Sequence, residues 1–437
     1  MIKIFKNIFL LALLAVGVSS TAQNTTSSPY SQFGLGDLKG PFLPQNRAMG
    51  GLSMGVRKPS LYDNINFANP ASYSTLALTT FDVGAATDLR KLSKAGISGK
   101  NQFNATLSHI TFGIPVSKSS AISFGLVPYT NLGYGFTNSA KIDTTNVQYV
   151  YDGEGGISKA YMGYGFKIGK KLSLGFNVGY LFGSLKENRA VEFIDALDLA
   201  RSFNSRTQYQ QSVGGLSIDY GLQYAANLND KTKLILGYAG NAGKDLNSKN
   251  NTVTTRYRID LDSRGERVEQ SVADSTFFSE GSNLKIRMPL SHTAGFAFEK
   301  TNSWLIGADV SYSKWSDYRE GTVDPGFNNS YGVVVGGQLT PDATSVSNYW
   351  KLVDYRLGLK YDRTFVKIRD NDIKQYALTF GFGFPLPSNR SSFYKINLST
   401  EIGQRGTEKN NLVRDRYINI NLGFLLNDKW FQKTYIE

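Results

Sequence analysis

Cysteine is absent from the 437-residue sequence, which excludes disulfide bonds and the lipid anchor of a lipoprotein. Only two histidines are present, His109 and His292. Long apolar runs are also missing, because Ile8 to Val18 is shorter than the roughly 20 residues that a membrane-spanning helix needs. Proline is scarce, with 12 residues, whereas glycine (44), phenylalanine (27) and tyrosine (25) are abundant. This composition favours strands and close backbone approaches over helices.

The sequence does not indicate catalytic, metal or cofactor sites. Both histidines fall in expected strands, and no nucleophile or set of metal ligands accompanies either of them. Gly163-Tyr164-Gly165 and Gly381-Phe382-Gly383 resemble part of a dinucleotide-binding pattern, but no helix follows them. A stretch that begins like a calcium loop at Asp260 lacks the required oxygen ligands further on. We therefore predict no catalytic residue, no metal and no cofactor, and do not expect an enzyme.

The first 22 residues have the pattern of a secretory signal. Lys3 and Lys6 precede a short apolar run, and Ser20 and Ala22 form a small-x-small cleavage pair. We predict a signal peptide over residues 1–22. Nucleic acid is therefore not an expected partner, although the formal net charge of the whole sequence is +13.

Apolar and polar residues alternate with period two in most segments after residue 75, which is the pattern of strands. In one such segment the large side chains share a face: Leu172, Leu174, Phe176, Val178, Tyr180 and Phe182. The opposite face carries small and polar residues: Ser173, Gly175, Asn177 and Gly179. The sheets of a soluble sandwich or propeller bury apolar faces against each other, whereas here the hidden face is polar in segment after segment. The apolar face is therefore expected to contact lipid.

Short polar turns alternate with connections that are mostly longer, as in outer-membrane barrels whose termini both lie in the periplasm. Because lipid offers no hydrogen bonds, such a sheet must close. Residues 76–426 are thus predicted to form an all-β, transmembrane antiparallel β-barrel in the outer membrane of a Gram-negative bacterium, followed by a periplasmic tail over 427–437. The alternating segments give fourteen strands: 76–89, 102–116, 121–136, 158–168, 172–183, 212–228, 232–240, 284–299, 304–315, 329–339, 349–368, 373–386, 392–405 and 412–426.

Residues 23–75 show no sustained alternation but are too apolar for a disordered tail. A barrel of fourteen strands is wider than the eight-stranded size that its own side chains can fill. We therefore predict that residues 23–75 form a hatch that plugs the lumen.

Several motifs, in this order and spacing, resemble the FadL-type family of outer-membrane long-chain fatty-acid transporters. They are Arg47-Ala48-Met49-Gly50-Gly51, Asn69-Pro70-Ala71, Trp315-Ser316, Tyr349-Trp350-Lys351 and Tyr355-Arg356-Leu357-Gly358. The resemblance covers residues 29–426. It implies a monomeric barrel blocked by a hatch, with hydrophobic substrate captured among extracellular loops, passed to a lumenal pocket and released sideways through a gap at a strand kink.

The resemblance suggests residues for each part. The hatch would depend on Arg47, Gly50, Gly51, Asn69, Pro70 and Ala71. A hydrophobic ligand would contact Phe33, Phe42, Met49, Met54, Phe67, Phe193, Leu197 and Trp315.

Two local features leave alternatives open. Residues 192–203 break the alternation and place Phe193 and Leu197 on one helical face, which predicts either a capture helix or a helix that packs a loop. In the strand 102–116, Leu107 and Ile110 lie on opposite parities, so a bulge or kink is expected at Ser108 and His109. That irregularity is either the lateral gap or a barrel bulge without a transport role.

The predicted function is passive uptake of hydrophobic, fatty-acid-like molecules. The alternative is an accessory barrel, without transport, in an outer-membrane secretion or assembly complex that includes a periplasmic or outer-membrane protein partner. The tail around Trp430 and the lumenal charges at Arg356, Lys360, Asp362 and Glu401 favour this alternative. Membrane lipid and lipopolysaccharide are further expected partners, because basic residues such as Lys91 and Lys249 are expected in the outer loops.

Overall fold

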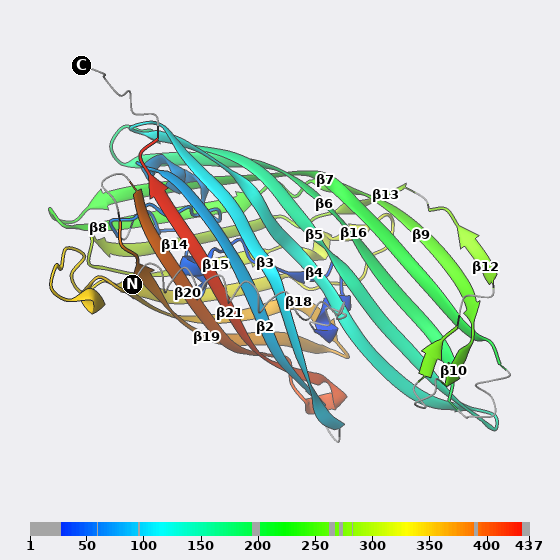
Figure 1. The fold of residues 1–437 in the computed structure, drawn as a ribbon. Coiled ribbons are helices and arrows are strands. Elements are labelled where there is room, and N and C mark those ends of the chain that lie inside the picture. The colour runs from blue at the N-terminus through cyan, green and yellow to red at the C-terminus, as the bar shows by residue number, and fades with distance from the viewer. Residues whose placement is uncertain are drawn as a thin grey trace, which may run out of the picture.

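The wall is a closed antiparallel sheet, in which the last strand pairs with the first (Figure 1). The computed structural model describes residues 28–58, 60–94, 97–194, 202–261, 267–270, 274–281, 283–388 and 392–430. The predicted barrel of fourteen strands is confirmed. Its wall is formed in order by β2 (Thr79–Lys94), β3 (Ile97–Ser117), β4 (Ser120–Ile142), β5 (Thr145–Ile168), β6 (Leu172–Phe193), β7 (Asn204–Asn227), β8 (Thr232–Asn241), β14 (Ser291–Lys300), β15 (Trp304–Ser313), β17 (Ser330–Leu339), β18 (Asp354–Ile368), β19 (Asn371–Pro385), β20 (Ser392–Arg405) and β21 (Val413–Asp428).

Alternate side chains face opposite sides of the wall, as the sequence predicts. In β6, Phe176, Val178 and Tyr180 are exposed on the outside, whereas Ser173 and Asn177 are buried toward the lumen. A broad apolar outer face on a closed sheet is stable only in lipid. The chain is therefore a Gram-negative outer-membrane protein. No helix in the described residues is long and apolar enough to span a membrane.

Several expected loops are strands that continue beyond the membrane. β4 has 23 residues, about twice the roughly 9–11 that cross the apolar layer. The expected loops over 137–157 and 184–211 are largely paired backbone. These predictions were wrong because strands in water do not need one apolar face, so the period-two signal fades while pairing continues. The extension is completed by β9 (Asp245–Tyr257), β12 (Asp274–Ser279), β13 (Asn283–Arg287) and β16 (Arg319–Glu320), with a separate hairpin of β10 (Ile259–Leu261) and β11 (Arg267–Glu269).

The expected helix over 192–203 is wrong at its start. Phe193 is the last residue of β6 and pairs with Val147. Leu197 lies outside the described residues.

Residues 28–78, named here the lumenal segment, precede the wall and lie inside it (Figure 1). Inward-facing groups on opposite sides of the barrel contact this segment: Tyr73 Oη donates to Asn177 of β6, and the backbone N–H of Ser53 donates to Asp309 of β15. Its elements are η1 (Pro29–Gln32), β1 (Asp37–Leu38), α2 (Pro44–Arg47) and η2 (Pro70–Thr75). The remaining short helices lie in connections between strands: η3 (Trp315–Asp317), η4 (Tyr349–Lys351) and η5 (Lys409–Asn411).

Candidate functional site

The wall splits between β3 and β4. These strands pair only from Ile110↔Leu126 to Ser117↔Ser120. Beyond Ile110, the described part of β3 pairs with β2 alone, and the rest of β4 pairs with β5 on its other side. The two strands therefore diverge with increasing distance from the end of the barrel at which β2 begins and β21 ends, as Figure 1 shows. Because Thr79 and Asp428 mark the periplasmic end in barrels of this kind, the split faces the extracellular half.

Irregularities in both strands lie where the pairing ends. In β3, Gly84 pairs with His109 and Ala85 pairs with Leu107, so Ser108 is an unpaired bulge residue. In β4, the register against β5 shifts between Pro128 and Thr130. Proline has no N–H to donate and is tolerated at sheet edges. Pro128 therefore suits the position at which β4 stops pairing with β3.

The bulge is tied to the lumenal segment through buried polar side chains. Ser108 Oγ lies 3.2 Å from His109 Nδ1, and His109 Nε2 lies 2.9 Å from Asp82 Oδ1. The side-chain amide of Gln45 in α2 donates to the other Asp82 oxygen at 3.4 Å. Sequence reasoning found no partner for His109 because Asp82 lies 27 residues away on the neighbouring strand. These four side chains are buried, and their contacts hold the bulge in place.

The lumenal segment covers the edge of β4 that faces the split. Leu38 pairs with Thr130 and Asp37 with Asn131, forming the short strand β1 along β4. The N–H of Lys39 donates to the Tyr129 carbonyl at 2.9 Å, which extends the ladder by one more bond. The backbone groups of this part of β4 are therefore satisfied by the lumenal segment where β3 has diverged.

Ion pairs hold this part of the lumenal segment to β20 and β2. Asp37 lies 2.7 Å from Arg405 of β20 and 3.7 Å from Arg90 of β2. Arg90 also contacts Asp415 of β21 at 2.7 Å. Burial alone would raise the pKa of the Asp37 carboxyl, but the charges of Arg405, Lys39 and Arg90 outweigh it and hold the pKa well below its usual range. Asp37 is therefore ionised in the folded protein at neutral pH.

An apolar cluster fills the lumen beside β1. Two partly buried aromatic rings pack against it: Phe365 stacks on the buried Trp315 with ring centroids 3.9 Å apart, and Phe327 meets Phe365 edge-on at 5.0 Å. The buried members come from the lumenal segment, the wall and the extracellular extension: Leu35, Leu132, Tyr134, Ile157, Leu181, Leu185, Val213, Leu246, Ile286, Met288, Trp315 and Tyr318. The cluster includes Leu35 and Leu132, so it reaches the strand edge at the split.

The residues expected in the hatch all belong to the lumenal segment, but they contact different parts of the wall. Arg47 donates to the carbonyl oxygens of Phe42 and Gly40 and thus braces the segment itself. Gly50 and Gly51 both have positive φ, which glycine adopts without strain.

Asn69, Pro70 and Ala71 lie against the opposite side of the barrel. The Asn69 side chain caps η2 at the N–H of Ala71 and donates to the Leu222 carbonyl. The backbone of Pro70 lies so close to Gly175 that a β-carbon there would overlap it.

Among the described residues, those expected to bind a hydrophobic ligand lie in several separate places. Trp315 belongs to the apolar cluster beside β1. Four others pack in separate places. Phe33 packs beside Tyr30 and Val366, Phe67 with Val127 and Tyr161, Met49 with Leu52 and Val56, and Phe42 near Gly51. Met54 is buried with its backbone against Gly237.

The lumenal charges expected from the sequence are paired. Arg356 contacts Asp354 at 2.7 Å, and Lys360 contacts Asp362 at 3.0 Å. Glu401 accepts a hydrogen bond from Tyr417 at 2.9 Å. The sequence did not single out Asp354 as a partner of Arg356. Asp354 is the first residue of β18, whereas that strand was expected to start at residue 349. Sequence reasoning also missed Asp37 and Pro128, of which only the proline carries a local signal.

Comparisons with known proteins agree with this architecture. The model of the family described as BamG matches residues 1–437. No curated protein gives a significant match to the sequence. Among solved structures, the Pseudomonas putida toluene transporter TodX is 15% identical, with a TM-score of 0.57, covering 89% of this chain and 98% of TodX. A Pseudomonas aeruginosa FadL homologue is 12% identical, with a TM-score of 0.55 and coverage of 90% and 100%.

The Ralstonia pickettii toluene transporter TbuX is similar to the same extent, at 14% identity and a TM-score of 0.55, covering 89% of this chain and 98% of TbuX. At these identities the likeness establishes a FadL-type fold. The neighbours named are transporters or transporter homologues, and none is described as an enzyme.

Proposed function

The chain belongs to the BamG family, and from its FadL-type fold we propose that it is an outer-membrane channel for passive uptake of hydrophobic, fatty-acid-like molecules. In this proposal the lumenal segment is the hatch and the split between β3 and β4 is the lateral exit. The observation that carries the proposal is the position of the split, which borders both the bilayer and the apolar cluster at Leu35 and Leu132.

Physical chemistry favours this route over an aqueous pore. Moving a hydrophobic molecule from an apolar environment into water costs free energy. A path from an apolar lumen directly into lipid avoids that cost. The exposed side chains of Phe103 and Leu107 on β3, and of Leu38 on β1, provide an apolar rim at the split. Transport would require β1 to move away from β4, because β1 covers that edge.

A reversible lock tests the exit. The chain has no native cysteine, and Leu38 and Thr130 are direct cross-strand partners, a spacing that suits a disulfide. In cells that depend on this chain for uptake of a labelled fatty acid, oxidation of L38C/T130C should abolish uptake and reduction should restore it. The matched control is K141C/N146C, which joins direct partners at the outer end of β4 and β5. Uptake that persists in the oxidised L38C/T130C protein would refute the lateral route.

A second candidate function is an accessory, non-transporting barrel of an outer-membrane secretion or assembly complex. The BamG match favours it, and so does the burial of much of the lumenal segment against the wall, including Met49, Leu52 and Ile65. Deleting the gene distinguishes the candidates. Unchanged fatty-acid uptake, together with defective insertion of other outer-membrane proteins, would support the accessory role.

A further inference from the structure

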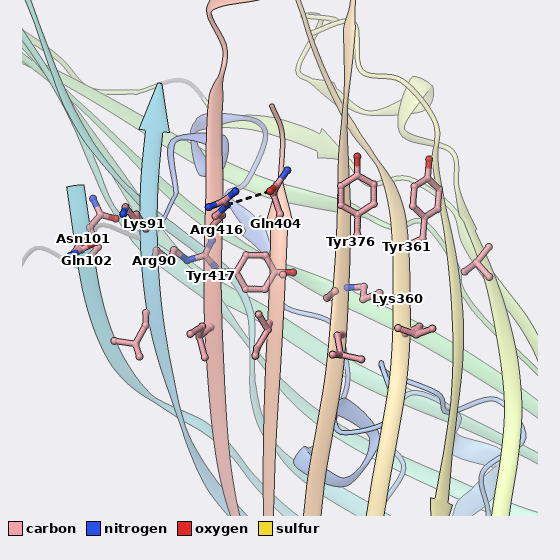
Figure 2. A pocket seen from close by; sticks show the side chains of 18 of the residues that line it. Arg90, Lys91, Asn101, Gln102, Lys360, Tyr361, Tyr376, Gln404, Arg416 and Tyr417 are labelled. Carbon is pink, nitrogen blue, oxygen red and sulfur yellow. Dashed lines mark hydrogen bonds between the residues drawn. The ribbon is translucent and has the colours of Figure 1, made fainter. Parts of the chain in front are cut away.

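A groove of about 930 Å³ runs across the outer surface of seven neighbouring strands, from β17 through β18, β19, β20, β21 and β2 to β3. Figure 2 shows its side chains aligned in rows across the strands. None of its lining residues belongs to the apolar cluster beside β1 or to the apolar rim of the split, and the proposed transport function does not use it.

Two adjacent rows line the groove, and each consists of direct cross-strand partners. The apolar row contains Leu89, Ile418, Ile402, Leu378, Leu359 and Val335. The polar row, one step further toward the extracellular end, contains Asn101, Lys91, Arg416, Gln404, Tyr376 and Tyr361. A step from aliphatic to cationic and amide side chains on a lipid-facing wall marks the boundary between acyl chains and headgroups.

This boundary lies on the outer-leaflet side of the membrane. β2 begins at the periplasmic end with Thr79, and its outward residues Phe81, Val83 and Leu89 carry no charge. Lys91 is the first charged outward residue on β2, and Arg416 is its direct partner on β21. Both therefore lie at the height of the outer-leaflet headgroups.

Among the described residues, the two cations have no anionic partner. Lys91 and Arg416 are directly opposite each other, an arrangement in which like charges repel. Within the described residues neither forms an ion pair, and Arg416 makes only a 3.5 Å hydrogen bond to Gln404.

The nearby carboxylates are engaged elsewhere. Asp88 and Asp415 are buried on the lumenal side, where they contact Lys39 and Arg90. Glu408 pairs with Arg414 at 2.7 Å. An anion between Lys91 and Arg416 would relieve their repulsion.

We propose that this groove binds a phosphorylated lipid of the outer leaflet, with a phosphate between Lys91 and Arg416 and acyl chains on the apolar row. The argument for a lipid is complementarity in both charge and depth: the cations lie at the headgroup level, and the aliphatic floor lies immediately on the membrane side of them. Gln404 and Asn101 add amide donors beside the cations, which suits the sugar hydroxyls of a phosphorylated saccharolipid such as lipid A.

Binding of lipid A to the purified full-length chain in neutral detergent tests the site. The probes are lipid A with two phosphates, the same lipid after phosphatase treatment, and inorganic phosphate as competitor. Wild type should prefer the phosphorylated lipid, and inorganic phosphate should compete only weakly because it lacks acyl chains. K91Q/R416Q should bind phosphorylated lipid A about 30-fold more weakly, from about 1 kcal/mol for each lost cation.

The matched control is K141Q/R256Q, which removes two exposed cations from the extracellular extension and should leave the affinity unchanged. An equal loss in the control, or none in K91Q/R416Q, would overturn the proposal. If K91Q/R416Q does not fold, wild type decides alone: native mass spectrometry that retains both lipids equally would refute the phosphate site. If inorganic phosphate displaced bound lipid A as effectively as free phosphorylated lipid A does, the proposal that the ligand is a lipid would be refuted.

Discussion

At the scale of single residues, Asp37 connects the lumenal segment to the far wall. It is the shared partner of Arg405 and Arg90, and its side chain is largely buried. We expect D37N to destabilise the barrel by about 3 kcal/mol, because removing one partner leaves buried cations without their counter-charge. Thermal unfolding in detergent at pH 7 measures the loss. D362N, which alters a more exposed ion pair with Lys360 outside the segment, is the control and should lower the unfolding temperature much less than D37N.

The same contact predicts a pH dependence. Because the pKa of Asp37 is lower in the folded protein than in the unfolded chain, its contribution to stability is complete above the unfolded value of about 4 and declines as pH falls toward the folded value. The difference in unfolding temperature between wild type and D37N should therefore narrow below about pH 4. A constant difference from pH 7 to pH 2 would contradict the assigned role.

Gly237 of β8 is a second residue on which the lumenal segment depends. A β-carbon there would overlap the backbone carbonyl of Met54. The backbone N–H of Met54 donates a hydrogen bond to Asp309, which limits how far the segment can move. We expect G237A to cost about 1–3 kcal/mol and to make residues 28–78 more sensitive to protease, because the segment must shift. G214A on the outer face, where the added carbon first meets the Tyr180 hydroxyl, should be nearly neutral.

At the scale of elements, the divergence of β3 from β4 follows from one inserted residue and one proline. Deleting Ser108 should restore a continuous ladder between β2 and β3, since Gly84 and Ala85 would then face consecutive residues. We expect the deletion to leave the barrel folded but to narrow the split and reduce uptake of the labelled fatty acid. Deleting Ser119 in the periplasmic turn between β3 and β4 is the control. Equal uptake by wild type and the Ser108 deletion would argue against the split as the exit.

Element boundaries were predictable only where lipid constrains the sequence. Across the membrane every second residue must be apolar, so strands such as β8, β15 and β17 were placed within a few residues. In the extracellular extension, residues 145–156 of β5 have water on at least one side, and their pairing with β6 leaves no period-two pattern. The split itself depends on which strands pair over long distances, and only the parity change around Ser108 signalled it.

At the scale of the whole molecule, the closed wall requires an amphiphile. The outer face exposes large side chains on most strands, including Met162, Leu216, Val310 and Leu357. We expect the chain to aggregate in buffer alone and to fold in detergent or lipid, where it should migrate differently in electrophoresis before and after heating. A monodisperse, folded chain in buffer without amphiphile would contradict the membrane barrel.

The candidate site was less predictable than the wall. A lumenal location for the first residues follows from their apolar composition and the width of the barrel. Their individual contacts do not, because Asp37, Asp82 and Asp354 acquire partners only when distant strands come together. The ligand residues expected from the sequence pack in several small clusters for the same reason: composition indicates that they are buried, but not which of them are neighbours.

The strip of β1 along β4 has a consequence for biogenesis. Residues 37–39 are among the first to leave the ribosome after the predicted signal, yet their charged contacts come from β20 and β2, and β2 is closed by β21, the last strand. Once β21 has joined β2, the wall offers no sideways entry, and residues 28–78 could reach the lumen only through an open end of the barrel. We therefore expect this segment to pack on the unfinished sheet before or while β21 closes it.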